Sequence, residues 1–233
     1  MAWDEIHHPH ADALAAACAD RIGQAIDEAI ATRRRAALAL AGGTTSAPIL
    51  RLLALQRHDW RAVTILPTDE RWVPPVHADS NLRLLRAALA GADGIRWCSL
   101  VPDDPPGEPD ATWAKAALAT LPRPLDLCML GMGSDGHFAS LFPGAPGLHA
   151  ALDPAGRDAA VAIVPDPLPA AGPHPRISLT LARLLDSRRL MLVASGAEKL
   201  AVLRRAQRRG GRDLPVAALL NATHPAAAIH WSP

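Results

Sequence analysis

The sequence predicts an α/β protein in which strands alternate with helices and form a mainly parallel sheet covered by helices. Two short segments, the continuously apolar residues 36–41 and the residues 125–130, apolar except for Asp126, each end at glycines, which is typical of strands buried in such a sheet. Segments with apolar residues at helical spacing separate the strand-like ones, and strands joined through helices run parallel. The length of 233 residues, with 49% apolar and 20% charged residues, suits one sizeable core, so we expect a single domain over residues 1–233.

The first half of the chain is expected to supply three helices and two strands. Residues 11–32 carry apolar side chains three or four positions apart with charged ones between them, which predicts a helix. Residues 36–41 are helical by propensity, but their shortness and the glycines that follow favour a strand. The next strand is expected at residues 62–66, and two more helices at residues 46–56 and 79–90, the latter with Asp79 or Ser80 as its N-cap.

The second half repeats this alternation more loosely. Residues 102–109 and 165–175 are proline-rich loops, and neither separates two complete core patterns. Helices are expected at residues 110–120 and 198–209, the second of them basic, and a helical turn at residues 215–220. Strands are expected at residues 125–130, 159–164, 190–194 and 228–231, and residues 177–179 are short and extended.

Composition and charge argue against several classes of function. Lys and Arg number 24 against 23 Asp and Glu, so the chain has no general attraction for nucleic acids or anionic membranes. The run Arg204, Arg205, Arg208 and Arg209 has no aromatic residues between its members, which favours a solvated helix face over nucleic-acid binding. The polar N-terminus is no secretory signal, and no apolar run approaches the roughly 20 residues of a membrane span. The three cysteines lack the spacing of a zinc site or a disulfide framework, so we expect a cytoplasmic protein without a metal.

Polar loops follow three of the predicted strands, at the carboxyl ends of the strands, where such proteins bind ligands. In the first loop, Gly42 and Gly43 permit close backbone approach. The hydroxyls of Thr44, Thr45 and Ser46, together with the helix N-terminus that follows, offer donors to a phosphate. The loop has neither a Walker A nor a GxGxxG pattern, and an ordinary turn with a Ser or Thr cap explains it about equally well.

Charged side chains at other strand ends are candidates for anion binding. Asp69, Glu70 and Arg71 could orient a polyol and clamp an anion, with a solvated, salt-bridged turn as the plainer alternative. Lys199 is one of only two lysines and begins a helix after a strand, whereas Arg176 opens an extended segment. Both are candidate partners of a phosphate, although each taken singly is more typical of a solvated surface charge.

The loop after the strand at residues 125–130 carries the most specific chemistry. Its sequence, GMGSDGH over residues 131–137, places three glycines beside a carboxylate and an imidazole. Glycines at this density suggest a backbone that needs positive φ, or a ligand that needs room. An imidazole is the natural general base for activating water, which makes His137 the candidate for that role. Asp135 could bind substrate hydroxyls or orient the imidazole.

Taken together, these segments resemble the 6-phosphogluconolactonase family, within the larger group that includes glucosamine-6-phosphate deaminases. Five pieces match in order across most of the chain. They are residues 40–45 (LAGGTT), 68–74 (TDERWVP) with 79–81 (DSN), 130–144 (LGMGSDGHFASLFPG), 176–180 (RISLT), and Gly196 with Lys199. The third piece is the most specific, because the deaminase branch has Gly-His-Ile-Ala-Phe-Asn-Glu-Pro after the same glycines. Both phenylalanines of the chain, Phe138 and Phe142, fall within it.

The resemblance implies a three-layer αβα, Rossmann-like fold and hydrolysis of 6-phospho-D-glucono-1,5-lactone to 6-phosphogluconate, with no metal and no organic cofactor. This reaction is the second step of the oxidative pentose phosphate pathway. By similarity, His137 would deprotonate the water that attacks the lactone carbonyl, with Asp135 beside it. Donors near residues 131–134, among them Gly133, or the guanidinium of Arg71 would stabilise the oxyanion. Other residues would hold the substrate: Gly42, Gly43, Thr44, Thr45, Arg176 and Lys199 at the phosphate, and Asp69 and Asn81 at sugar hydroxyls or in support of the loop.

The sequence departs from the family pattern in a few places, and two other functions are alternatives. Ala41 stands where Ser is common, which removes one donor, Ser46 stands where Pro is usual, and Phe138 where Thr is frequent. A glucosamine-6-phosphate deaminase or isomerase is one alternative, against which residues 140–143 (SLFP) argue; a non-catalytic sugar-phosphate sensor is the other. The expected partner is a small sugar-phosphate lactone, without nucleic acid or membrane, and the expected state is a monomer or weak homodimer.

Overall fold

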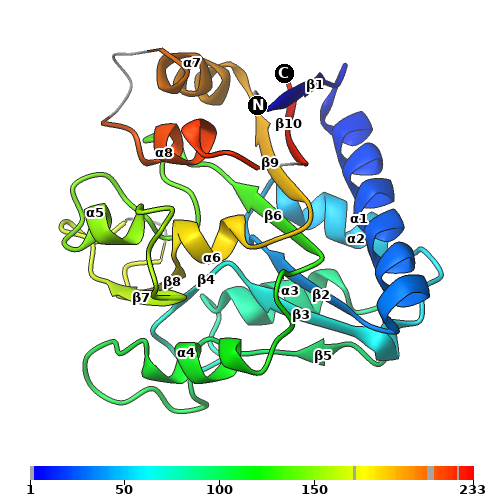
Figure 1. Ribbon diagram of the computed structural model, residues 1–233, viewed down its shortest axis with the longest axis horizontal. Helices are drawn as coiled ribbons and strands as arrows, with labels where there is room; N and C mark the ends of the chain where they lie inside the picture. The colour runs from blue at the N-terminus through cyan, green and yellow to red at the C-terminus, as the bar shows by residue number, and fades with distance from the viewer. Residues whose placement is uncertain (1–2, 170–171, 209–212, 225) are drawn as a thin grey trace.

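A seven-stranded parallel sheet forms the centre of the protein, as the computed structural model in Figure 1 shows. The structure describes residues 3–169, 172–208, 213–224 and 226–233. The strands of this sheet, in the order in which they lie side by side, are β1 (Asp4–His7), β10 (Ala227–Ser232), β9 (Leu190–Ser195), β6 (Leu127–Gly131), β2 (Ala36–Leu40), β3 (Val63–Pro67) and β5 (Arg96–Trp97). The prediction of a mainly parallel sheet is confirmed.

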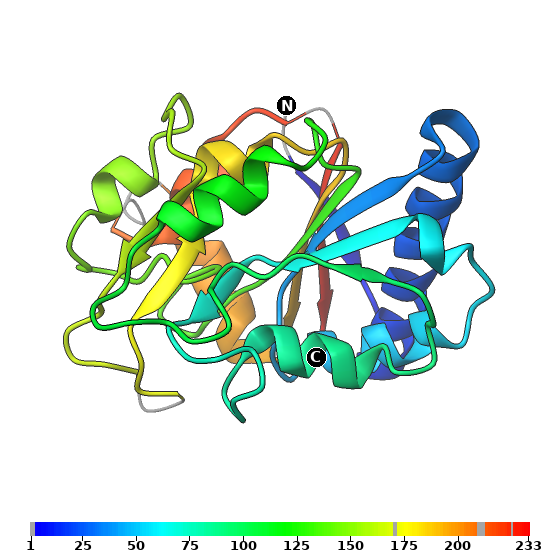
Figure 2. The same cartoon turned by 90° about the horizontal axis from the view of Figure 1, so that it is seen from below.

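Helices cover both faces of this sheet. The helices are α1 (Ala11–Arg33), α2 (Ser46–Ala54), α3 (Asn81–Ala88), α4 (Thr112–Ala119), α5 (Leu148–Ala151), α6 (Leu181–Leu185), α7 (Ala197–Ala206) and α8 (Pro215–Asn221), with a 3₁₀ turn at Trp60–Ala62. Figure 2 shows α1, in blue, on one side of the sheet and α4, in green, on the other. The three layers of an αβα fold are therefore present. None of the described helices is both long enough and apolar enough to cross a bilayer.

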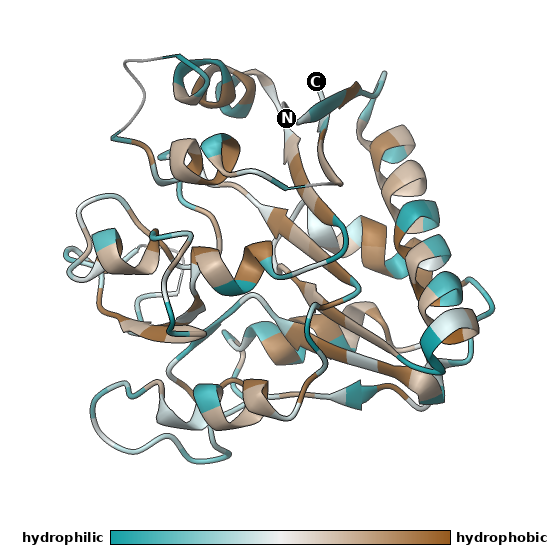
Figure 3. Ribbon diagram, viewed as in Figure 1, coloured by the Kyte–Doolittle hydropathy of each residue, from teal (hydrophilic) through white to brown (hydrophobic). Residues whose placement is uncertain are grey.

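Alternation of side chains along β6 explains the layers. Leu127 and Met129 belong to the apolar cluster that includes residues of α1, α2 and α3. Cys128 and Leu130 point the other way, into the cluster with residues of α4, α6, α7 and α8. A strand covered on both faces must be apolar throughout, which is why β2 and β6 are continuous apolar runs in the sequence and brown along their length in Figure 3.

A second, three-stranded antiparallel sheet adjoins the first and was not expected from the sequence. Its strands, in order, are β4 (Asp69–Arg71), β8 (Arg176–Leu179) and β7 (Ala160–Ile163). Thr68 alone separates β3 from β4, so the chain passes from the parallel sheet to the antiparallel one at the carboxyl end of β3. Ile177 and Leu179 of β8 share an apolar cluster with Leu130 of β6, so the two sheets have a common core.

Most of the expected elements are confirmed, with ends that differ by a few residues. The cap of α3 is Ser80, whose hydroxyl accepts a hydrogen bond from the backbone N–H of Arg83 at 3.2 Å. The strands β1 and β5 and the helices α5 and α6 were missed. β1 is a largely exposed edge strand with the sequence DEIH, and the two helices have only four and five residues, so none of them shows a periodic pattern. Residues 170–171 of the predicted loop and Arg209 of the predicted basic helix lie outside the described residues.

Candidate functional site

A cleft of about 430 Å³ lies at the carboxyl ends of β2 and β6. These neighbouring strands mark a change of direction in the sheet, because the chain continues from β2 to β3 on one side and from β6 to β9 on the other. Open α/β sheets bind their ligands at such a point. Most of the residues predicted for the site line the cleft: Gly42, Gly43, Thr44, Thr45, Asp69, Arg71, Asn81, Gly133, His137 and Lys199.

The loop between β2 and α2 presents backbone and hydroxyl groups to this cleft. Gly43 has a φ of +99°, a conformation that favours glycine. A Cβ on Gly42 would lie 2.6 Å from Oδ1 of Asn81, so glycine lets that amide pack against the loop. Thr45 is the N-cap of α2 but its side chain makes no capping hydrogen bond, and Oγ of the buried Ser46 has no hydrogen-bond partner among the described residues. The loop is therefore not the ordinary capped turn of the alternative interpretation.

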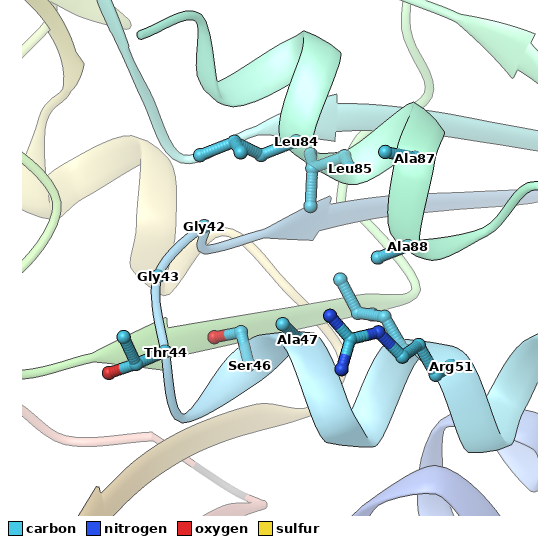
Figure 4. A pocket seen from close by; sticks show the side chains of 11 residues that line it. Gly42, Gly43, Thr44, Ser46, Ala47, Arg51, Leu84, Leu85, Ala87 and Ala88 are labelled. Carbon is cyan, nitrogen blue, oxygen red and sulfur yellow. The ribbon is translucent and has the colours of Figure 1, made fainter. Parts of the chain in front are cut away.

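The same loop also borders a second, mainly apolar pocket of about 330 Å³. Figure 4 shows how side chains from α2 and α3 surround this pocket, with Leu84, Leu85 and Ala88 on α3 and Arg51 on α2. Residues 42–44 and Ser46 line both cavities, so the loop forms the wall between them.

His137 and Asp135 form a hydrogen-bonded pair in the turn after β6. Oδ1 of Asp135 lies 2.6 Å from Nδ1 of His137 and accepts a second bond from the backbone N–H of His137 at 3.1 Å. A carboxylate at Nδ1 holds the proton on that nitrogen, which leaves the lone pair of Nε2 free to accept a proton. Burial opposes ionisation of Asp135, but the hydrogen bond and charge interaction with His137 outweigh it and lower the pKa of the carboxyl group. Of the two roles predicted for Asp135, this geometry supports orientation of the imidazole.

Close packing on both sides fixes the imidazole ring. A Cβ on Gly133 would lie 2.3 Å from Nδ1 and Cε1 of His137, so the ring rests directly on the backbone of a residue that has no side chain. The ring of Phe142 packs against it, with centroids 4.3 Å apart and planes at 38°. The backbone N–H of Gly133 donates to the carbonyl oxygen of His137 at 2.9 Å and closes the turn. The side chain of His137 nevertheless stays 30% exposed, so solvent reaches it.

A buried carboxylate, Glu70, joins β4 to the start of α3. Its two oxygens accept hydrogen bonds of 2.7–3.0 Å from the backbone N–H groups of Arg71, Asn81 and Leu82 and from the hydroxyl of Ser80. Burial raises the pKa of Glu70, and these hydrogen bonds only partly oppose the shift. A negative charge at a helix N-terminus is favourable. Glu70 therefore supports the wall of the cleft without lining it.

Asp69 and Asn81 stand on this support and line the cleft. Nδ2 of Asn81 donates to the carbonyl oxygen of Asp69 at 2.7 Å. The carboxylate of Asp69 accepts from Oγ of Ser140 at 2.6 Å and from Oγ1 of Thr68 at 3.1 Å. Ser140 comes from the loop after β6, so this contact ties the two sides of the cleft together.

Arg71 and Lys199 bring positive charge to the cleft. Nη1 of Arg71 donates to the carbonyl oxygen of Asp79 at 2.5 Å. Lys199 lies in the first turn of α7, after Gly196, whose N–H donates to Ser232 and whose carbonyl accepts from the indole of Trp231. Burial lowers the pKa of Lys199, and the charge of Glu198 opposes the shift.

Arg176 is the predicted phosphate ligand that the structure does not bring to the cleft. It lies opposite Arg71 in the pairing of β4 with β8 and is 2% exposed. Its Nη2 donates to the carbonyl oxygen of Gly172 at 2.6 Å. Burial and the charge of Arg71 lower the pKa of Arg176 to about 10. Arg176 therefore adds positive charge beside Arg71, and a direct contact with a phosphate stays a prediction.

Comparison with known proteins agrees with the motifs. Residues 9–231 match the protein family described as Glucosamine-6-phosphate isomerases/6-phosphogluconolactonase. The chain belongs to this family. It is 40% identical to the 6-phosphogluconolactonase of Pseudomonas putida, over 97% of this chain and 92% of that protein, and 38% identical to that of Rhizobium meliloti (strain 1021), over 95% of each. The crystal structure of a 6-phosphogluconolactonase from Shewanella baltica OS155 superposes with a TM-score of 0.90, at 32% identity, over 99% of this chain and 98% of that one.

Some residues of this family member's site were not singled out from the sequence. Ser140 and Phe142 lie within the family motif, but nothing in the motif indicates that one binds Asp69 and the other packs on His137. Glu70 was considered as a ligand group, and the structure uses it as a support. A carboxylate ten residues before the cap of a helix is no signal in itself, because only the fold brings β4 against the start of α3.

Proposed function

We propose that the chain hydrolyses 6-phospho-D-glucono-1,5-lactone to 6-phospho-D-gluconate, the second step of the oxidative pentose phosphate pathway. The 6-phosphogluconolactonases to which it is similar support this substrate class. The observation that carries the proposal is His137, hydrogen-bonded to Asp135, in a cleft that Arg71 and Lys199 also line. A base together with cations suits a substrate that has a reactive carbonyl at one end and a phosphate at the other.

In the proposed reaction, His137 acts first as a base and then as an acid. Nε2 removes a proton from water as the water oxygen attacks the lactone carbonyl carbon, and a tetrahedral oxyanion forms. Collapse of this intermediate restores the carbonyl and breaks the bond between that carbon and the ring oxygen. The departing ring oxygen takes the proton from Nε2, which returns the imidazole to its starting form. Asp135 stabilises the transient imidazolium through Nδ1, and a hydrogen-bond donor at the oxyanion would contribute about 3 kcal/mol.

We assign binding of the phosphate to residues of the cleft other than His137. Lys199 and Arg71 supply charge, and Thr44, Thr45 and the open N-terminus of α2 supply hydrogen-bond donors. Asp69 and Asn81 are left for sugar hydroxyls, which need both acceptors and donors. Holding the phosphate at one end places the lactone ring at the other, where the base stands.

The test is acid release from enzymatically generated 6-phosphogluconolactone, measured against the spontaneous rate with and without the protein. The wild type should accelerate release, and His137→Asn should lose nearly all of the acceleration while 6-phosphogluconate still binds within a few-fold of the wild-type affinity. Unchanged turnover in H137N would refute the assigned base. Release of ammonia from glucosamine 6-phosphate, assayed in parallel, would favour the deaminase reaction instead.

A further inference from the structure

Two histidines and an aspartate from separate loops converge beside Arg71, outside the residues that line the cleft. His77 and Asp79 lie between β4 and α3, and His174 lies just before β8. Nε2 of His174 is 2.8 Å from Oδ2 of Asp79, and Nδ1 of His77 is 4.0 Å from the same oxygen. The two imidazole rings meet edge to face, with centroids 5.4 Å apart. One donor atom from each side chain lies within 4.8 Å of the other two, and no other group of three His, Cys, Asp or Glu side chains in the described part of the chain comes this close.

We propose that His77, Asp79 and His174 form a binding site for a divalent transition-metal ion of the zinc, cobalt or nickel type. Imidazole nitrogen suits these ions, whereas magnesium and calcium select sites built from oxygen alone. Two histidines and one carboxylate are also a common set of three protein ligands for such an ion, with water in the remaining positions. The site does not depend on the proposed lactonase activity.

The donor atoms need only a small movement to close on an ion. Zinc binds nitrogen and oxygen at roughly 2.0–2.2 Å, so its ligand atoms lie on the order of 3.4 Å from one another. The distances of 2.8 and 4.0 Å to Asp79 bracket this value. The backbone N–H of Asp79 donates to Nδ1 of His77 at 3.1 Å, so Nδ1 carries the lone pair of the ring, and that hydrogen bond must break when the lone pair turns to an ion. The three side chains are 25–42% exposed, so an ion can enter and water can complete its shell.

Charge at the site makes Asp79 the essential member. The guanidinium of Arg71 is bound to the carbonyl oxygen of Asp79 and repels a dication. The carboxylate is the one negative group among the three ligands, so it must offset that repulsion. The structural alternative is that the bond between Asp79 and His174 serves only to join the two loops.

Metal titration of the intact protein, after removal of bound metal with a chelator, distinguishes the two. Calorimetry with Zn²⁺ and the visible absorption of added Co²⁺ should show one ion per chain with micromolar affinity, and excess Mg²⁺ should not displace it. His174→Ala and Asp79→Asn should each weaken binding at least tenfold. The matched control is His149→Ala, since His149 is an exposed histidine of α5 outside this group, and it should bind as the wild type does.

Equal affinity in the wild type and in H174A, or an equal loss in H149A, would overturn the proposal, because binding would then be scattered over surface histidines. A measurement on the unmodified chain covers the case in which a variant folds poorly. Co²⁺ should broaden the ring-proton resonances of His77 and His174 at concentrations that leave those of His149 sharp. Simultaneous broadening of all three would refute the site.

Discussion

Gly133→Ala tests whether the position of the His137 ring limits catalysis. Gly133 is not among the residues with positive φ, so alanine suits the backbone and the substitution acts through its Cβ alone. That Cβ would lie 2.3 Å from Nδ1 and Cε1 of the imidazole, whereas ordinary contacts begin near 3.4 Å. The ring must therefore retreat by about 1 Å, together with Oδ1 of Asp135, which the same Cβ would approach to 2.6 Å, and a displacement of that size costs on the order of 100-fold in rate. Because the ring is partly exposed, it can swing toward solvent with little loss of folding stability.

The assay compares kcat for lactone hydrolysis, affinity for 6-phosphogluconate and melting temperature. We expect kcat to fall about 100-fold in G133A while the other two quantities stay near their wild-type values. Gly91→Ala is the matched control, because its Cβ would meet its nearest neighbour, the carbonyl oxygen of Ala54, at an ordinary 3.4 Å. A kcat of G133A within twofold of the wild type would refute the argument, as would a parallel loss of ligand affinity and stability.

Three further variants test the orientation of the base, the binding of the phosphate, and the role of Glu70 in supporting the wall of the cleft. Asp135→Asn should lower kcat by roughly 10²–10⁴-fold with KM little changed, because a neutral amide neither fixes the tautomer nor stabilises the imidazolium; pre-steady-state or steady-state rates check this, and an equal rise in KM would speak against it. Lys199→Ala should weaken binding of 6-phosphogluconate by roughly 10- to 100-fold, the size of a charged hydrogen bond, as calorimetry would show; unchanged affinity would remove Lys199 from the site. Burial raises the pKa of Glu70, so its contribution to folding is complete below the unfolded value near 4.5 and declines as the pH rises through the folded value. The difference in unfolding free energy between the wild type and Glu70→Gln, from urea denaturation at a series of pH values, should therefore shrink with rising pH, and a growing difference would contradict the shift.

The parallel sheet could be predicted from the sequence because a strand that is buried on both faces has a continuously apolar sequence. β2 and β6 are unbroken apolar runs that stop at glycines, and the loops after them carry the groups that the cleft uses. The pair of Asp135 and His137 was likewise readable, since two residues of a single turn must lie close together. The spacing left open which role the carboxylate has, and the 2.6 Å contact with Nδ1 supports orientation of the imidazole.

Features that depend on contacts between distant segments of the chain correspond to no such local pattern in the sequence. The antiparallel sheet pairs Arg71 with Arg176, and nothing local to either residue shows that one lines the cleft while the other is buried beside it. The bond from Ser140 to Asp69 joins two loops in the same way. The edge strand β1 was missed for a different reason, because an exposed strand gains nothing from an apolar sequence.

The bonds between Gly196 and the last strand have a practical consequence for anyone who prepares this protein. Ser232 and Trp231 hold the residue that immediately precedes α7, three positions before Lys199. An affinity tag fused after Pro233 would emerge next to this contact, at the carboxyl ends of the strands, where the cleft also lies. A tag fused before β1 would leave from the amino ends of the strands, on the side away from the cleft, because β1 runs parallel to β10 and starts beside the start of β10. Purification handles therefore belong at the amino end, and kinetic constants measured with a carboxyl-terminal tag should be checked after its removal.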